Sequence, residues 1–211
     1  MVDASSSKES DTRATIEKID LKIKSCTLCR LSQTRTNAVP GFGRIIGTQI
    51  MMVGEGPGRN EDMEGKPFVG AGGRLLDELL SSVGLKREEI YVTNIVKCRP
   101  PDNRKPLEDE IEICTSNYLE RQIEILRPKL ICTLGATALE YFTGEKKMGA
   151  WHGKLTRTKK GVPLLPTYHP ASVFRNPEYR LLLRQDLGAI PKILSDLEKR
   201  PTQSRLTSFI C

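Results

Sequence analysis

Four short apolar segments, each followed by a turn, constrain the fold of this chain more than any other feature. They cover residues 49–53 (QIMMV), 90–93 (IYVT), 130–134 (LICTL) and 163–167 (PLLPT). Continuous apolar runs of this length are typical of strands that are buried on both faces of a parallel sheet. Helical patterns lie between and after them, at about 71–84, 107–126, 136–142 and 177–197. This alternation predicts an α/β fold, a three-layer α/β/α sandwich around a central four-stranded parallel sheet.

The turns after these segments bring unusual residues to one edge of the predicted sheet. The first strand runs into 54–58 (GEGPG), the second into Asn94, and the fourth into 168–170 (YHP). Ligands of open parallel sheets bind beyond the carboxyl ends of the strands. We therefore expect these turns, which are far apart in the sequence, to line one cleft.

The length of 211 residues suits one domain with a substantial core and short tails. Residues 1–14 are Ser-rich and charged, so we expect a disordered N-terminal tail there. The spacing of Ile16, Ile19 and Ile23 predicts a helix over 15–24. The folded domain would cover 15–197. Residues 198–211, where the apolar periodicity ends, would form a C-terminal tail.

The charge balance favours a polyanionic partner. The chain has 33 Lys and Arg against 26 Asp and Glu, a net charge of +7, and an isoelectric point near 9.1. Nucleic acid is the commonest partner of such a basic protein. No apolar run approaches the roughly 20 residues of a membrane helix, and the polar N-terminus has no apolar core, so we do not expect a secretory signal. We expect a monomer without membrane contact, located in the cytoplasm and, in a prokaryote, at the nucleoid.

Six cysteines in an intracellular chain favour metal or cluster ligation over a disulfide framework. Four of them lie in or beside polar stretches: Cys26, Cys29, Cys98 and Cys114. Four thiolates suit a [4Fe–4S] cluster and a structural zinc ion equally, and free core cysteines are the third alternative. Cys132 lies within a predicted strand and is expected in the core, and Cys211 is expected to be a free thiol.

The glycine-rich turn after the first strand can bring backbone N–H groups close to a ligand. Its spacing, G-x-G-x-G, differs from the dinucleotide fingerprint, and it lacks the Gly-Lys-Ser/Thr ending of a phosphate loop. A plain tight turn is the alternative interpretation. That interpretation leaves the acid in the middle of the turn, Glu55, without a role.

Three further residues have both a structural and a functional interpretation. Phe68, on a Gly/Pro-rich loop, would be core or a stacking platform for a base. Asn94 would cap a helix or read a base edge, because its amide offers both an acceptor and donors. His169 would be structural or catalytic, next to Ser172, which could contact phosphate. His152 is expected to be structural.

With these residues identified, the chain resembles the family 4 uracil-DNA glycosylases, an iron–sulfur type, over about 25–197. The motifs that carry the resemblance occur in the family's order and spacing. They are the CxxC pair, GEGPG, GKPFVGAGG, TNIVKCRPP with a later cysteine, and the His-Pro pair after the last strand. The resemblance implies a monofunctional glycosylase that hydrolyses the N-glycosidic bond of uracil in single- or double-stranded DNA. It would leave an abasic site for base excision repair.

The resemblance also implies roles for single residues. Cys26, Cys29, Cys98 and Cys114 would be the ligands of one [4Fe–4S] cluster. Glu55 would position the attacking water, and His169 would face uracil O2. Phe68 would stack on the extruded base and Asn94 would read it. The remaining substrate-binding residues would be Gly54, Gly56, Pro57, Gly58 and Ser172.

One departure concerns a relative that binds uracil-DNA covalently. It does so through a Lys/Arg-rich insertion that ends in His and follows the Asn strand. Here residues 99–105 (RPPDNRK) contain no His, so we expect turnover rather than covalent capture.

The C-terminal tail carries a separate signal. Gln203, Leu206, Phe209 and Ile210 resemble the Q-x-x-L-x-x-F-F motif that docks repair proteins on the sliding clamp PCNA, with Ile in place of the last aromatic residue. We expect this tail to bind the clamp.

Two other function classes are weaker. A module that binds nucleic acid without chemistry explains the charge and the cysteines, but it gives no role to Glu55, Asn94 and His169. A nucleobase deaminase needs H-x-E followed by P-C-x-x-C. This chain has no H-x-E, and its CxxC comes first.

Overall fold

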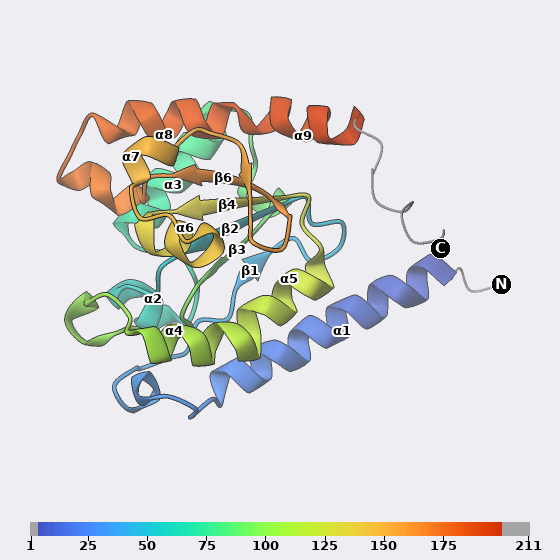
Figure 1. The fold of residues 1–211 in the computed structure, drawn as a ribbon. Coiled ribbons are helices and arrows are strands. Elements are labelled where there is room, and N and C mark those ends of the chain that lie inside the picture. The colour runs from blue at the N-terminus through green and yellow to red at the C-terminus, as the bar shows by residue number, and fades with distance from the viewer. Residues whose placement is uncertain (1–3, 200–211) are drawn as a thin grey trace, which may run out of the picture.

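The computed structural model describes residues 4–199, with a six-stranded mixed sheet at the centre (Figure 1). The strand order across the sheet is β1-β3-β2-β4-β6-β5. The strands are β1 (Phe42–Gly43), β2 (Ile50–Gly54), β3 (Ile90–Asn94), β4 (Leu130–Leu134), β5 (Thr156–Arg157) and β6 (Pro163–Thr167).

The four central strands, β3, β2, β4 and β6, run parallel, which confirms the predicted arrangement of the four apolar segments. The predicted sheet size was wrong, because β1 and β5 add an antiparallel strand at each edge. Each edge strand has only two residues. So short a segment cannot display an apolar run or an alternating pattern, and its pairing depends on the strand beside it.

Helices cover both faces of the sheet (Figure 1). They are α1 (Ala4–Lys24), α2 (Arg59–Glu64), α3 (Ala71–Ser82), α4 (Glu108–Cys114), α5 (Glu120–Leu126), α6 (Ala136–Thr143), α7 (Met148–Trp151), α8 (Tyr179–Gly188) and α9 (Ile190–Lys199).

Alternation along the central strands divides the core into two layers. In β2, Met51 and Val53 join the core under α1, α5 and α6, whereas Ile50 and Met52 join the core under α3 and α8. Successive side chains of a strand point to opposite faces, so a fully apolar strand serves both layers. The predicted three-layer sandwich is therefore present.

The first helix is longer than the sequence predicted. We expected disorder over 1–14, but α1 already begins at Ala4, and residues 1–3 lie outside the described part. The helix is anchored by Ile16, Ile19 and Ile23, which are buried in the layer that contains α5. Residues 7–11 and 13–15, which precede this anchor, are exposed and still belong to the helix, because a polar composition does not prevent backbone hydrogen bonding.

The predicted helix over 107–126 is interrupted. A π-helical segment, Thr115–Leu119, separates α4 from α5 and begins directly after Cys114. Single π-helical turns within α-helices are frequent at functional sites. The predicted helix over 177–197 is likewise two helices, α8 and α9.

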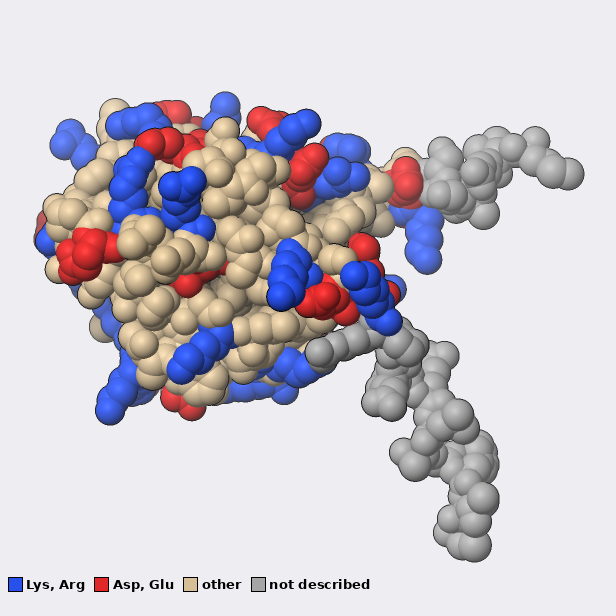
Figure 2. All heavy atoms as spheres, turned by 90° about the horizontal axis from the view of Figure 1, so that it is seen from above, with Lys and Arg blue, Asp and Glu red and all other residues tan. Residues whose placement is uncertain are grey.

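Within residues 4–199, no helix is long and apolar enough to cross a membrane. Figure 2 shows the face that α8 and α9 cover, where Lys and Arg side chains are interspersed with Asp and Glu. The positive charge is therefore not concentrated in one band on this face.

Candidate active site

The carboxyl ends of the parallel strands border a cleft of about 800 Å³. The predicted residues that line it are Glu55, Gly56, Pro57, Gly58, Phe68, Asn94, His169 and Ser172. Gly54 lies buried beneath them, at the end of β2. The cleft thus brings together residues from three strand ends and from the loop before α3, as the sequence predicted.

The glycine-rich turn is fixed to the segment that follows β3. The N–H groups of Ile95 and Val96 donate to the carbonyl oxygens of Gly54 and Glu55, at 2.9 and 3.1 Å. The carboxylate of Glu55 is half-buried and accepts a hydrogen bond of 2.5 Å from the hydroxyl of Thr137, in the first turn of α6. One carboxylate oxygen of Glu55 is therefore held by the protein at the edge of the cleft.

Asn94, the last residue of β3, is 2% exposed. Its side-chain oxygen Oδ1 is buried and has no hydrogen-bond partner among the described residues. Leaving a buried acceptor unpaired costs about 1–3 kcal/mol, so such a group needs an explanation. The crowding around it is tight, because a Cβ on Gly54 would lie 2.5 Å from this oxygen. Only glycine at position 54 leaves room for the amide.

Phe68 lies beside Asn94 with an unusual backbone. Its φ is +56°, a conformation that costs a non-glycine residue about 1–3 kcal/mol. Phe68 is 7% exposed, and its ring stacks against the ring of His169, with centroids 5.9 Å apart and planes at 27°. The guanidinium carbon of Arg87 lies over the Phe68 ring, 5.9 Å from the centre of that ring. The strained turn therefore delivers an aromatic ring into the cleft.

His169 is held as a neutral imidazole with a defined tautomer. Its Nδ1 accepts the backbone N–H of Ala171 at 3.1 Å, so the ring proton lies on Nε2. Burial lowers the pKa of His169 to about 4, although the Glu61 carboxylate acts in the opposite direction. At neutral pH the ring therefore presents an N–H donor without carrying a charge.

Ser172 follows in the short 3₁₀ helix Pro170–Phe174. Its hydroxyl donates to the carbonyl oxygen of His169 at 2.6 Å. That proton is therefore already used to shape the turn after the histidine, and a phosphate contact would require the hydroxyl to rotate away.

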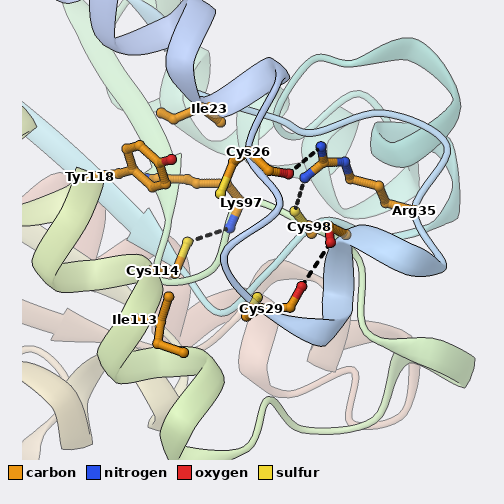
Figure 3. Close-up of a pocket in the computed structure, with 10 residues that line it drawn as sticks. Ile23, Cys26, Cys29, Arg35, Lys97, Cys98, Ile113, Cys114 and Tyr118 are labelled. Atoms are coloured by element: carbon orange, nitrogen blue, oxygen red, sulfur yellow. Dashed lines mark hydrogen bonds between the residues drawn. The ribbon is translucent and has the colours of Figure 1, made fainter.

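A second cavity lies among the four cysteines of the predicted ligand set (Figure 3). Cys26 follows α1, Cys29 precedes a 3₁₀ turn, Cys98 follows β3, and Cys114 ends α4. Figure 3 shows their sulfurs around one space. Within residues 4–199, no group of three or more His, Cys, Asp or Glu side chains is arranged to hold a metal ion.

Two N–H donors point at the sulfurs of this cavity (Figure 3). Arg35 donates from Nη1 to Cys98 Sγ at 2.9 Å and from Nη2 to the carbonyl oxygen of Cys26 at 2.7 Å. The backbone N–H of Lys97 donates to Cys114 Sγ at 3.3 Å. Burial raises the pKa of the Cys98 thiol, and the hydrogen bond from Arg35 opposes this effect. Such donors stabilise thiolate sulfur, as iron–sulfur ligands require.

Comparisons with known proteins agree with this geometry. The family model described as the uracil DNA glycosylase superfamily matches residues 40–189. The chain is 46% identical to a Type-4 uracil-DNA glycosylase of Sulfurisphaera tokodaii, over 84% of each protein. It is 41% identical to one of Archaeoglobus fulgidus, over 89% of this chain and 96% of that protein. A third, of Thermotoga maritima, is 43% identical over 82% of this chain and 91% of its own. This chain belongs to the type-4 uracil-DNA glycosylases.

Glu61, in α2 of this type-4 glycosylase, was not among the predicted site residues. Its two carboxylate oxygens accept the backbone N–H groups of Gly58 and Gly70, at 3.1 and 2.8 Å. It therefore fastens the glycine-rich turn to the loop that carries Phe68. An acid three residues after a helix N-cap is a capping-box signal, and Gly58-Arg-Asn-Glu61 has that spacing.

Three other predictions concern residues outside the cleft. Cys132 is fully buried in the core, as predicted. The Nδ1 of His152 lies 3.3 Å from the Asp186 carboxylate, which also accepts the Thr167 hydroxyl at 2.6 Å. These contacts fit a structural role for His152. Cys211 and the clamp-like motif lie outside the described residues.

Proposed function

We propose that this protein removes uracil from DNA by hydrolysing the N-glycosidic bond, and that the reaction takes place in the cleft. The observation that carries the proposal is the buried, unpartnered Oδ1 of Asn94, which lies near the Phe68 ring, and that ring in turn stacks on His169. The unpaired acceptor of Asn94 and the neutral N–H donor of His169 would meet the polar edge of a pyrimidine, and the Phe68 ring would stack on its face. The products are free uracil and an abasic site for base excision repair.

Access to the bond requires the nucleotide to leave the duplex, at a cost of roughly a few kcal/mol. Stacking on Phe68 offsets part of this cost, at about 1–3 kcal/mol for an aromatic–base contact. In single-stranded DNA the cost of unpairing is absent, so both kinds of DNA are substrates.

Asn94 selects uracil among the bases. Its Oδ1 accepts from uracil N3–H, which supplies the partner that this oxygen lacks, and its NH₂ donates to O4. Cytosine presents the opposite polarity at both positions, so buried polar groups would remain unpaired. Thymine differs only by a methyl group, so it is excluded by shape.

His169 and the glycine-rich turn stabilise the departing base. Cleavage leaves negative charge on uracil and an oxocarbenium-like sugar. The Nε2–H of His169 donates to O2, and backbone N–H groups of 54–58 add to the stabilisation. A neutral donor is suited to this role because it does not have to transfer its proton.

Glu55 acts on the other side of the bond. Thr137 holds one carboxylate oxygen, and the second oxygen orients the water that attacks C1′. The negative charge of Glu55 also steadies the cationic sugar. The water's oxygen then bonds to C1′, and its proton leaves to the carboxylate or to solvent.

The test is release of free uracil from oligonucleotides that contain uracil, hypoxanthine or a thymine mismatch, in single- and double-stranded form. We expect excision of uracil by the unmodified chain, and losses of at least about 100-fold for Glu55→Gln and His169→Ala. The assignment of these two residues fails if both variants keep near-normal rates. The function fails if the unmodified chain binds uracil-DNA without releasing uracil.

We also propose that Cys26, Cys29, Cys98 and Cys114 hold one [4Fe–4S] cluster. Four thiols around one cavity, with N–H donors from Arg35 and Lys97, are the donor set that such a cluster needs. When bound, the cluster supplies iron–thiolate bonds that join α1, the segment after β3 and the end of α4. Its role is structural. Absorbance near 400 nm and about four irons per chain are expected, whereas a colourless protein with one zinc would contradict the proposal.

The tail 203–210 is proposed to dock on the sliding clamp through Gln203, Leu206, Phe209 and Ile210. The chain otherwise acts as a monomer, and its substrate places it at the nucleoid of a prokaryote. Deletion of residues 200–211 should abolish clamp binding in a pull-down with purified clamp and leave excision in a clamp-free assay unchanged. Equal clamp affinity of the deleted and full chains would reject the docking role.

A further inference from the structure

Lys97 is a buried lysine that contacts both the base-reading residue and the cysteine cavity. It is 1% exposed, and its ammonium donates to three acceptors. They are Thr93 Oγ1 at 2.6 Å, the carbonyl oxygen of Asn94 at 2.8 Å, and Gln122 Oε1 at 2.8 Å. Its backbone N–H donates in addition to Cys114 Sγ. No other residue in the described part of the chain makes hydrogen bonds to both Asn94 and a cysteine sulfur.

The direction of each hydrogen bond is determined by the neighbouring groups. The Thr93 hydroxyl donates to the carbonyl oxygen of Pro40 at 2.6 Å, so its oxygen can only accept from Lys97. The NH₂ of Gln122 donates to the Tyr91 hydroxyl at 3.1 Å, so its carbonyl faces Lys97. Three acceptors therefore surround three ammonium protons, which makes the position of Nζ rigid.

This position bears on uracil recognition through the peptide of Asn94. The side chain of Asn94 has no hydrogen bond that fixes its Oδ1 among the described residues, and the Gly54 backbone and the Phe68 ring lie close to it. Its main chain is therefore what sets where the amide points. The main chain of Asn94 pairs with Gly54 of β2, and the carbonyl oxygen of Asn94 accepts a hydrogen bond from Lys97.

We propose that Lys97 is a positioning residue for uracil recognition. Its ammonium holds the Asn94 carbonyl so that the side-chain amide faces the base. Its backbone N–H, which donates to Cys114 Sγ, connects this contact to the cysteine cavity. The proposal rests on the function proposed above and deepens it. Lys97 does not touch the substrate, so it acts only through Asn94. A merely structural lysine would instead stabilise the core without affecting the choice of base.

The variant that tests this is Lys97→Met, which keeps an unbranched chain one atom shorter and the backbone N–H to Cys114 but removes the ammonium. Displacement of a recognition group by about 1 Å costs roughly 100-fold. We expect the kcat/KM for uracil excision to fall by about that factor, while iron content and absorbance near 400 nm stay at the level of the unmodified chain.

The decisive readout is selectivity in binding. In a Glu55→Gln background, fluorescence anisotropy measures affinity for a single-stranded oligonucleotide with one uracil and for the same oligonucleotide with thymine. Lys97→Met should bring the ratio of the two affinities toward one and leave affinity for the thymine strand unchanged. Gln122→Met is the matched control, because it removes an equally buried partner of the ammonium and keeps the contact with Asn94. It should lower stability and preserve the ratio.

A double-mutant cycle separates a positioning role from a structural one. If Lys97 acts through Asn94, then Lys97→Met has no further effect on the affinity ratio in an Asn94→Ala background. Additive losses, or an unchanged ratio in Lys97→Met, would overturn the proposal. If Lys97→Met does not fold, Lys97→Gln, which also removes the ammonium but keeps a polar side chain in the buried site, should lower the ratio with the same non-additivity. Failure of the unmodified chain to release uracil would instead refute the proposed function.

Discussion

The neutral state of His169 has a measurable consequence for stability. Burial lowers the pKa of its imidazole to about 4 in the folded chain, against an ordinary value of 6.5. The hydrogen bond from the Ala171 N–H to Nδ1 would also be lost on protonation. In the unfolded chain the ring is solvated and titrates near its ordinary value.

Between these two values the unfolded chain binds a proton that the folded chain does not bind. Stability therefore rises with pH through this window and is fully present above about pH 7. The two pKa values differ by about 2.5, which corresponds to about 3 kcal/mol of stability in total at about 1.36 kcal/mol per pH unit. About 2 kcal/mol of this stability is lost as the pH falls from 7.5 to 5. The open side of the cleft makes these values upper bounds.

The perturbation is His169→Gln, which removes the titration and keeps a polar side chain. Urea unfolding of both proteins from pH 5 to pH 7.5 gives the difference in unfolding free energy at each pH. Other groups cancel in this difference, including Asp20, whose pKa burial raises to about 6 and whose effect on stability has the opposite sign. We expect the advantage of the unmodified chain over His169→Gln to shrink by up to about 2 kcal/mol as the pH falls to 5.

A pH-independent difference would refute the reasoning. So would a ring titration near pH 6.5 in the NMR spectrum of the folded chain, where only His152 and His169 give imidazole signals. The same reasoning predicts that His169 contributes no inflection to kcat/KM between pH 5 and pH 8.

Three further changes test the cleft. Gly54→Ala would place a Cβ 2.5 Å from Asn94 Oδ1, so excision should fall by about 100-fold, while Gly188→Ala, which meets only ordinary contacts, should leave the rate unchanged in the same assay. Glu61→Gln exchanges a carboxylate that accepts two backbone N–H groups for an amide with one acceptor oxygen. It should lower the urea midpoint and raise KM, and an unchanged KM would contradict this role. Phe68→Leu removes the stacking ring, so binding of uracil-DNA measured by anisotropy should weaken by about 5- to 150-fold, and equal binding would exclude stacking.

The parallel core and the location of the cleft could be predicted from the sequence for one physical reason. A strand that is buried on both faces must be apolar throughout, and 130–134 and 163–167 are strands over those same residues. Once four such strands are parallel, their carboxyl ends share an edge. The meeting of Glu55, Asn94 and His169 then follows without knowledge of any side-chain contact.

The features that could not be predicted depend on contacts between distant segments. The edge strand β1 exists because Phe42 and Gly43 pair with Val92 and Tyr91. The interruption after Cys114 has no separate signal in the apolar pattern of 107–126. The burial of Lys97 could not be predicted, because a lysine beside a cysteine, in a basic chain, is usually solvated. Its burial is possible only because acceptors from β3 and α5 converge on it.

The cleft concentrates features that would destabilise an ordinary protein. Phe68 has a positive φ, Asn94 buries an acceptor without a partner, and His169 is held neutral far below its usual pKa. Each costs on the order of 1–3 kcal/mol, and such costs persist where the surrounding structure over-determines the geometry. Here Glu61 holds the loop that carries Phe68, and Lys97 holds the main chain of Asn94. The cost of arranging and desolvating these groups falls on folding rather than on binding. In the proposed mechanism a uracil that completes the hydrogen bond to Asn94 would therefore gain the full free energy of that bond. A base of opposite polarity would gain none of it, which would make this preformed unpaired acceptor the source of selectivity.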